Sequence, residues 1–233
     1  MTPLMLLPGM MCDENLFTAQ VNAFKGDRLV MVANVSVADN MPDIARDILA
    51  QAPESFALAG LSMGGIVAME ILRQAPHRVE RLALLDTNPK AELIEVQSNR
   101  NRQIEIVQNG GLSQLMHSEM FPHYLADNLP LSQVKNILER CDEMAMKLGP
   151  QAFIRESRAL QKRVDQQGVL SKYKGPTLIL MGEQDKLCPL DRHQLMHSLL
   201  ENSKLVLIEN AGHLTTLEQP QAVNAALREW LSA

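Results

Sequence analysis

A Gly-Xaa-Ser-Xaa-Gly sequence centred on Ser62 constrains this chain more than any other stretch. It follows the apolar run 56–61, which is typical of a short buried strand, and leads into 64–74, whose apolar residues fit a covered helix. In a sharp turn from strand to helix the residues on either side of the serine nearly touch. Glycine at 60 and 64 removes the Cβ atoms that would collide. A plain Gly/Ser loop is the alternative, but the flanks favour a turn that exposes the Ser62 hydroxyl.

Strand-like and helix-like segments alternate along most of the chain. The expected strands are 4–7, 29–35, 56–61, 79–86, 177–181 and 205–208, and the expected helices are 14–24, 41–51, 64–74, 190–200 and 220–231. The valine-rich stretch 29–35 is expected to be buried on both faces. This order predicts an α/β fold with about six mostly parallel strands covered by helices.

Residues 89–173 interrupt the alternation. They contain helix-like stretches near 91–108, 111–119, 131–148 and 151–165, separated by glycine and proline. We therefore predict a core formed by 1–88 and 174–233, with a helical cap, 89–173, inserted into it. An insertion at the carboxyl end of a strand lies where such sheets bind ligands. A helical hairpin with no role in the chemistry is the alternative.

Composition narrows the class of protein further. The 233 residues fit one α/β domain, and the formal charge of −5 without a polybasic run argues against a nucleic-acid partner. The apolar start 1–8 lacks a basic segment and is too short to span a bilayer, so we expect a cytoplasmic protein without a membrane partner. Three widely spaced cysteines fit a reducing compartment. The oligomeric state is not predicted.

A serine hydroxyl needs a base to take its proton, and the base needs a carboxylate to orient it. Asp185 follows the expected strand 177–181, and His213 follows 205–208, so both should lie at the same sheet edge as Ser62. Their order along the chain, Ser, Asp, His, is the one associated with this turn. Asp86 also ends a strand and is the main rival to Asp185, and Glu183 is a weaker one.

These motifs together resemble α/β-hydrolase-fold serine hydrolases with a helical cap, such as small bacterial carboxylesterases and pimeloyl carrier-protein methyl ester esterases. The resemblance rests on Leu7-Pro8-Gly9-Met10, Gly60-Leu61-Ser62-Met63-Gly64-Gly65, Gly182-Glu183-Gln184-Asp185 and Ala211-Gly212-His213. It implies Ser62 as the nucleophile, His213 as general base and then acid, and Asp185 as the orienting carboxylate, without a cofactor.

The resemblance also implies an oxyanion hole formed by the backbone N–H groups of Met10 and Met63. Many members of the family have His-Gly after the first strand, whereas this chain has Pro8-Gly9, which keeps the backbone role and removes one side chain. His193 and His197 are four residues apart, but a third ligand is lacking, so we expect a solvated helix face and no metal.

The residues flanking these positions suggest an adaptable aliphatic pocket. The expected substrate-binding residues are Met11, Leu187, Leu214 and the aromatic Phe121 and Tyr124 of the cap. Core packing is the alternative for each of them.

A cluster of cations lies near the end of the expected cap. Its members are Arg155, Arg158, Lys162 and Arg163. They are candidates for steering an anionic acyl group or an acidic carrier protein. We favour a solvated helix face, because Glu156 and Asp165 dilute the positive charge.

Our leading hypothesis is a serine hydrolase that cleaves a small, largely aliphatic ester or thioester through an acyl-enzyme. A lactonase or a carbon–carbon bond hydrolase would use the same three residues. The alternative from another class is a hydrolase-fold receptor or binding protein whose triad is slow or vestigial.

Overall fold

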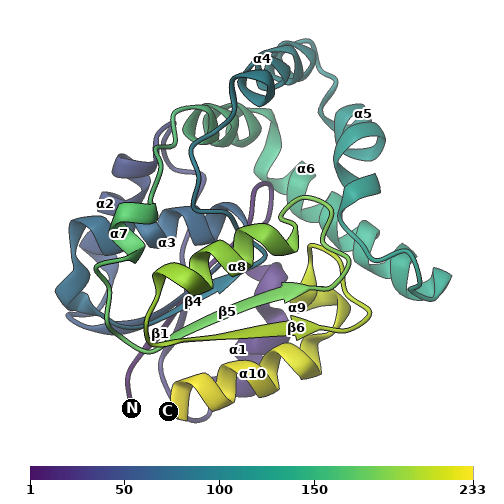
Figure 1. The fold of residues 1–233 in the computed structure, drawn as a ribbon. Coiled ribbons are helices and arrows are strands. Elements are labelled where there is room, and N and C mark those ends of the chain that lie inside the picture. Colours follow the sequence, from purple (N-terminus) through teal and green to yellow (C-terminus); the bar gives the residue numbers. More distant parts are fainter. Residues whose placement is uncertain (233) are drawn as a thin grey trace.

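A single sheet of parallel strands organises the computed structural model, which describes residues 1–232 (Figure 1). The strands are β1 (Leu4–Leu7), β2 (Val30–Val32), β3 (Phe56–Leu61), β4 (Val79–Leu85), β5 (Thr177–Gly182) and β6 (Ser203–Ile208). Their spatial order is β2-β1-β3-β4-β5-β6, and every neighbouring pair is parallel. The predicted α/β fold with about six strands is therefore confirmed.

Burial differs between the central and the edge strands. β1, β3 and β5 are buried along their whole length, because neighbours pair with both their edges and helices cover the sheet. β2 is only half-buried, since it is an edge strand that pairs with β1 alone. The expectation that this strand is buried on both faces is wrong.

The core helices pack on the two faces of the sheet. They are α1 (Thr18–Phe24), α2 (Met41–Gln51), α3 (Met63–Gln74), α8 (Leu190–Leu199), α9 (Thr215–Glu218) and α10 (Pro220–Ser232), with short 3-10 turns at Glu14–Phe17 and Pro76–Arg78. α1 and α10 pack together on one face, while α2 packs on α3, which covers β1, β3 and β4 on the other. The chain thus has the two helical layers that a parallel sheet requires.

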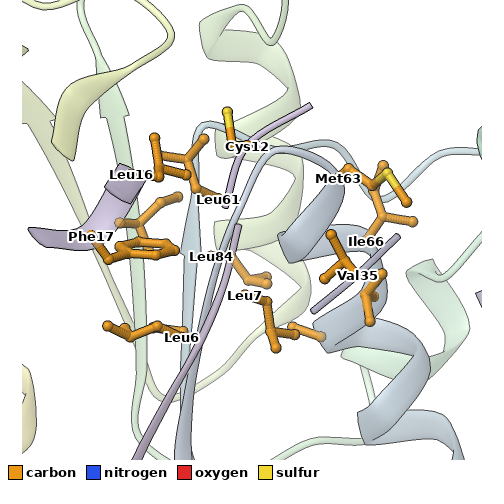
Figure 2. Packing of buried hydrophobic residues seen from close by; sticks show 14 of the residues in the cluster. Leu6, Leu7, Cys12, Leu16, Phe17, Val35, Leu61, Met63, Ile66 and Leu84 are labelled. Carbon is orange, nitrogen blue, oxygen red and sulfur yellow. The ribbon is translucent and has the colours of Figure 1, made fainter. Parts of the chain in front are cut away.

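Alternating side chains join the sheet to both layers. Figure 2 shows Leu6 near Leu16 and Phe17 on one side of the sheet, and its neighbour Leu7 near Val35 and Ile66 on the other. Successive strand residues point to opposite faces, so an unbroken apolar strand is buried on both. This packing fixes the strand ends on which the site is built.

The segment between β4 and β5 consists of helices and turns. It contains α4 (Ile94–Gln108), α5 (Leu112–Leu115), a π-helical turn (Met116–Met120), a 3-10 turn (Phe121–His123), α6 (Leu131–Gln161) and α7 (Gln167–Leu170). α6 has a kink at Gly149, whose φ of 76° lies outside the helical region and which precedes Pro150. α4, α5 and α6 lie on the side of the molecule away from both termini (Figure 1). Within residues 1–232 no helix is long and apolar enough to cross a membrane.

Candidate active site

Ser62 lies in the turn that joins β3 to α3. Its φ of 54° and ψ of −117° are strained for a residue with a side chain. A Cβ at Gly60 would strike the carbonyl of Gly64, and a Cβ at Gly64 would strike the carbonyl of Leu7. Glycine is therefore required at both positions, for the reason that the sequence motif predicts.

The main chain around Ser62 is held by several hydrogen bonds. The Ser62 carbonyl accepts the N–H groups of Gly65 and Ile66, at 2.9 and 3.2 Å, and the Thr87 hydroxyl at 2.7 Å. Sequence reasoning missed Thr87, which follows β4 and carries no motif of its own. Because Ser62 precedes the first residue of α3, the positive end of the helix dipole faces the site.

His213 and Asp185 form a hydrogen-bonded pair. Nδ1 of His213 lies 3.0 and 2.9 Å from the two carboxylate oxygens of Asp185, and both residues are buried. The backbone N–H of His213 donates to the Tyr124 carbonyl at 2.8 Å, which ties the histidine to the helical segment. These contacts do not use the other ring nitrogen of His213, Nε2.

Backbone donors stabilise the charge of Asp185. Its Oδ1 accepts the N–H groups of Leu187 and Cys188, at 2.8 and 2.9 Å. Burial opposes ionisation, but His213 and these two N–H groups outweigh it, so the pKa of Asp185 lies below its usual value. The site therefore holds an ionised carboxylate behind the imidazole.

Asp86, the rival carboxylate, faces other partners. Its oxygens accept the backbone N–H of Gly182 at 2.9 Å and the hydroxyl of Thr215. Burial, and then the charge of Asp185, raise the pKa of Asp86 well above its usual value. Glu183, the weaker rival, is exposed. Of the three candidate acids, Asp185 is the one hydrogen-bonded to His213.

In the loop after β1, one backbone N–H donates a hydrogen bond to a side chain that is distant in sequence. Met11 has a φ of 56°, and its N–H donates to Oε2 of Glu156 at 2.8 Å. The N–H of Cys12 donates to the Gly9 carbonyl at 3.1 Å. The N–H groups of Met11 and Cys12 are thus used within the protein, and the N–H of Met10, which precedes them, remains the candidate oxyanion donor.

Glu156 is fully buried on α6, so the expectation that it dilutes a surface charge is wrong. Burial raises its pKa to about 7, against the hydrogen bonds from Ser36 and Met11. No sequence signal predicts this contact, because Glu156 lies between residues that resemble a charged surface.

A cavity of about 630 Å³ lies at the proposed reaction centre. Ser62, His213, Met10 and Met63 all line it. Of the expected substrate-binding residues, Leu187, Leu214 and Tyr124 also line it.

Met11 and Phe121 are not among the described residues that line the cavity. The Met11 side chain is buried in the core. The Phe121 ring packs between His117 and Tyr124, with centroids 5.0 and 5.7 Å away.

His193 differs from its expected position on a solvated helix face. It is buried, its Nε2 accepts the N–H of Thr87 at 3.2 Å, and burial lowers its pKa to about 4. The expectation is therefore wrong for His193, whereas His197 is exposed. The neutral ring of His193 supports the strand end beside Asp86.

Among residues 1–232, ligand atoms spaced for a metal ion occur at Asp185, Cys188 and His213. Asp185 and His213 are already hydrogen-bonded to each other. Burial, and then the charges of Asp185 and Asp86, raise the pKa of the Cys188 thiol well above its usual value. Both carboxylate oxygens of Asp185 already lie within hydrogen-bond distance of His213 Nδ1, so this arrangement favours the carboxylate–histidine pair.

Comparison with known proteins finds similar sequences and structures. The "Alpha/beta hydrolase family" matches residues 27–226. "Putative carbamate hydrolase RutD" of Pseudomonas savastanoi is 24% identical over 176 residues, which cover 75% of this chain and 66% of that protein. A "Pimeloyl-[acyl-carrier protein] methyl ester esterase" of Neisseria meningitidis is 22% identical over 185 residues, 79% of this chain and 72% of that protein.

A solved structure is also similar over the full chain. The thermophilic esterase from Thermogutta terrifontis has a TM-score of 0.89 and 27% identity, and the match covers 100% of this chain and 90% of that one.

Proposed function

Because this chain belongs to the alpha/beta hydrolase family, we propose that it is a serine hydrolase acting on a carboxylic ester or thioester. Ser62 Oγ attacks the carbonyl carbon while His213 Nε2 takes its proton. The protonated His213 then gives the proton to the leaving alcohol or thiol, which departs and leaves an acyl group on Ser62. Water attacks this acyl-enzyme, His213 takes the water proton, and the acid is released as Ser62 recovers its hydrogen.

One observation carries the proposal. Ser62, with its strained backbone, lines the same cavity as His213. Nδ1 of His213 is hydrogen-bonded to the buried, ionised carboxylate of Asp185. This arrangement fixes the tautomer of the imidazole with a proton on Nδ1, so that Nε2 is the basic nitrogen. It also stabilises the imidazolium that forms when Ser62 reacts.

The oxyanion would form beside two backbone donors, the N–H groups of Met63 and Met10. Met63 begins α3, so its N–H has no partner within the helix. Met10 lines the cavity, and the N–H groups of the next two residues, Met11 and Cys12, are used within the protein. Losing one such donor typically costs about 10²–10³-fold in turnover.

We further propose that residues 89–173 act as a cap on a core formed by 1–88 and 174–233. The cavity wall supports this division, because Leu93 and Tyr124 from the helical segment line it together with Ser62 and Leu187 from the core. Met10, Met63 and Leu214 provide aliphatic surface next to the reacting groups, which suits a small acyl chain.

Replacement of Ser62 tests the proposal directly. The Ser62→Ala variant should lose hydrolysis of p-nitrophenyl butyrate and labelling by a fluorophosphonate probe, with an unchanged circular dichroism spectrum. Ser98→Ala is the matched control, since Ser98 is exposed on α4 and its hydroxyl donates to the Ile94 carbonyl. Equal labelling of the wild-type protein and Ser62→Ala would refute the proposal. Absence of labelling in the folded wild-type protein would instead indicate a binding protein.

A further inference from the structure

The cavity carries a surplus of positive charge, although the whole chain has a formal charge of −5. Its charged lining residues are Lys90, Glu92, Arg100, Glu119, Arg163 and Arg192. Glu119 is paired with Arg102, which is not a lining residue, through an ion pair of 2.5 Å. Glu92 is therefore the carboxylate that remains to balance the cavity cations.

Glu92 is shared by two arginines from different elements. Nε of Arg100, on α4, lies 2.8 Å from Oε2 of Glu92, and Nη2 of Arg163, just after α6, lies 2.9 Å from Oε1. The exposed fractions of the side chains are 4% for Glu92, 14% for Arg100 and 9% for Arg163. One carboxylate thus faces two largely buried guanidinium groups, which leaves one positive charge without a counter-ion.

The surrounding groups do not remove this surplus. Arg192 lies on the same cavity wall, and its partner Asp191 has a side chain that is 61% exposed to solvent. Burial lowers the pKa of Arg163, and Arg100 and Arg192 add to this effect while Glu92 opposes it. A guanidinium stays protonated in proteins, so the positive charge persists.

Each of the two arginines has a guanidinium nitrogen that these contacts do not use. Arg163 uses Nη2 for Glu92 and Nε for the Lys90 carbonyl at 3.1 Å, so its Nη1 is uncommitted. Neither Arg100 nor Arg163 is among the groups of residues 1–232 that have a buried nitrogen without a partner. Their unused nitrogens are therefore not sealed off inside the protein, and both residues line the cavity.

Arg100 also contacts the proposed oxyanion loop, because its Nη1 lies 3.8 Å from Sδ of Met10. An anion bound by the arginines would thus lie on the Met10 side of the reaction centre. A short aliphatic spacer between that anion and the scissile carbonyl fits this placement.

A buried charge without a counter-ion is costly, and a ligand carboxylate matches the fork of a guanidinium. We propose that Arg100 and Arg163 bind a carboxylate of the substrate, so that the substrates are half-esters or half-thioesters of short dicarboxylic acids. This inference rests on the proposed function and specifies the substrate class of the same site.

Matched esters test this assignment. Ethyl hydrogen adipate carries the carboxylate, and diethyl adipate has the same chain without it. We expect kcat/KM to be at least about tenfold higher for the half-ester, since hydrogen bonds to charged groups contribute that much to binding. In Arg163→Gln and in Arg100→Gln the ratio of kcat/KM for the half-ester to kcat/KM for the diester should fall to about one.

Arg46→Gln is the control, because Arg46 is an exposed arginine on α2 that pairs with Asp43, and neither residue lines the cavity. It should keep the preference. Thermal unfolding identifies a variant that fails to fold, and two independent arginine variants guard against that outcome. Equal kcat/KM for the two esters, or a preference that survives both arginine variants, would overturn the inference.

A binding measurement separates this inference from the proposed catalysis. Calorimetry with Ser62→Ala should show tighter binding of ethyl hydrogen adipate than of diethyl adipate, with the difference reduced by added salt. Selective binding without hydrolysis by the wild-type protein would leave the carboxylate site in place and remove the hydrolase proposal. Hydrolysis of neutral esters with equal binding of both adipates would support the hydrolase proposal and remove the carboxylate site.

Discussion

The backbone N–H of Met11 donates a hydrogen bond to the carboxylate of Glu156 over 2.8 Å, although 145 residues separate the two in sequence. Ser36, which follows β2, donates its hydroxyl to the other oxygen of the same carboxylate. Arg155, the neighbour of Glu156, donates from Nε to the Ser36 carbonyl at 2.7 Å. A buried acid on α6 thus holds two loops at the carboxyl ends of β1 and β2.

Removing this acceptor should impair turnover. In Glu156→Leu the Met11 N–H loses its partner, so the loop that holds Met10 can shift. We expect kcat for p-nitrophenyl butyrate to fall by up to about 10²-fold, because oxyanion donors act only when correctly placed. KM should change less, since the cavity wall remains.

Glu156→Gln is the matched control for this experiment. Its amide can accept from Met11 and donate to Ser36, so kcat should stay within about tenfold of the wild-type value. Wild-type kcat in a folded Glu156→Leu variant would show that the contact does not position the loop.

Glu156 also predicts a pH dependence of stability. Its folded pKa of about 7 lies above an unfolded value near 4.3, so the folded state binds the proton more tightly. The resulting stabilisation is complete below the unfolded pKa and is lost as the pH rises through the folded pKa. Its full size is about 4 kcal/mol. The charge of Arg155 lowers the pKa of Glu156 and so opposes the effect of burial. Burial raises the pKa values of the neighbouring Cys12 and Tyr124 well above their usual values, so both groups stay neutral over this pH range.

Urea unfolding at pH 4.5 and 7.5 measures this effect. The free energy of unfolding of the wild-type protein, relative to Glu156→Gln, should decrease by up to about 3 kcal/mol between the two values. Parallel pH profiles for the two proteins would contradict the prediction.

The two buried aspartates should differ sharply in their effect on catalysis. Asp185→Asn removes the charge that faces Nδ1 of His213 and favours the wrong tautomer, so we expect kcat to fall by about 10⁴-fold. In Asp86→Asn the amide can accept from Gly182 and donate to Thr215, so kcat should stay within about tenfold. Steady-state kinetics of the two variants decides between the acids, and a greater loss in Asp86→Asn would reverse their roles.

Local signals in the sequence accounted for the fold. The short apolar runs predicted the strands, and the requirement for glycine at 60 and 64 predicted the turn at Ser62 because both glycines act on nearby backbone. The carboxylate–histidine contact followed from the rule that parallel strands end at one edge, which brings Asp185 to His213.

The buried polar contacts could not be predicted in the same way. Glu156 and Arg163 occur in a stretch rich in charge, and local composition does not show which side of a helix is covered. Their burial depends on contacts with Met11 and Glu92, which are distant in sequence. The expected exposure of His193 is wrong for the same reason, since its hydrogen-bond partner Thr87 lies in another part of the chain.

The turn at Ser62 gives a stability test with an internal control. In Gly64→Ala the new Cβ would strike the carbonyls of Leu7 and Pro8, which are fixed by the sheet and its following loop. We expect a loss of about 1–3 kcal/mol in the free energy of unfolding, as for other overpacked sites, together with a loss of activity because Ser62 must move.

Gly168→Ala, on α7, is the control. Its Cβ meets open space, so the free energy of unfolding should rise by about 0.5–1 kcal/mol. Urea unfolding compares the two, and equal midpoints would mean that the close approach at Gly64 does not constrain the turn.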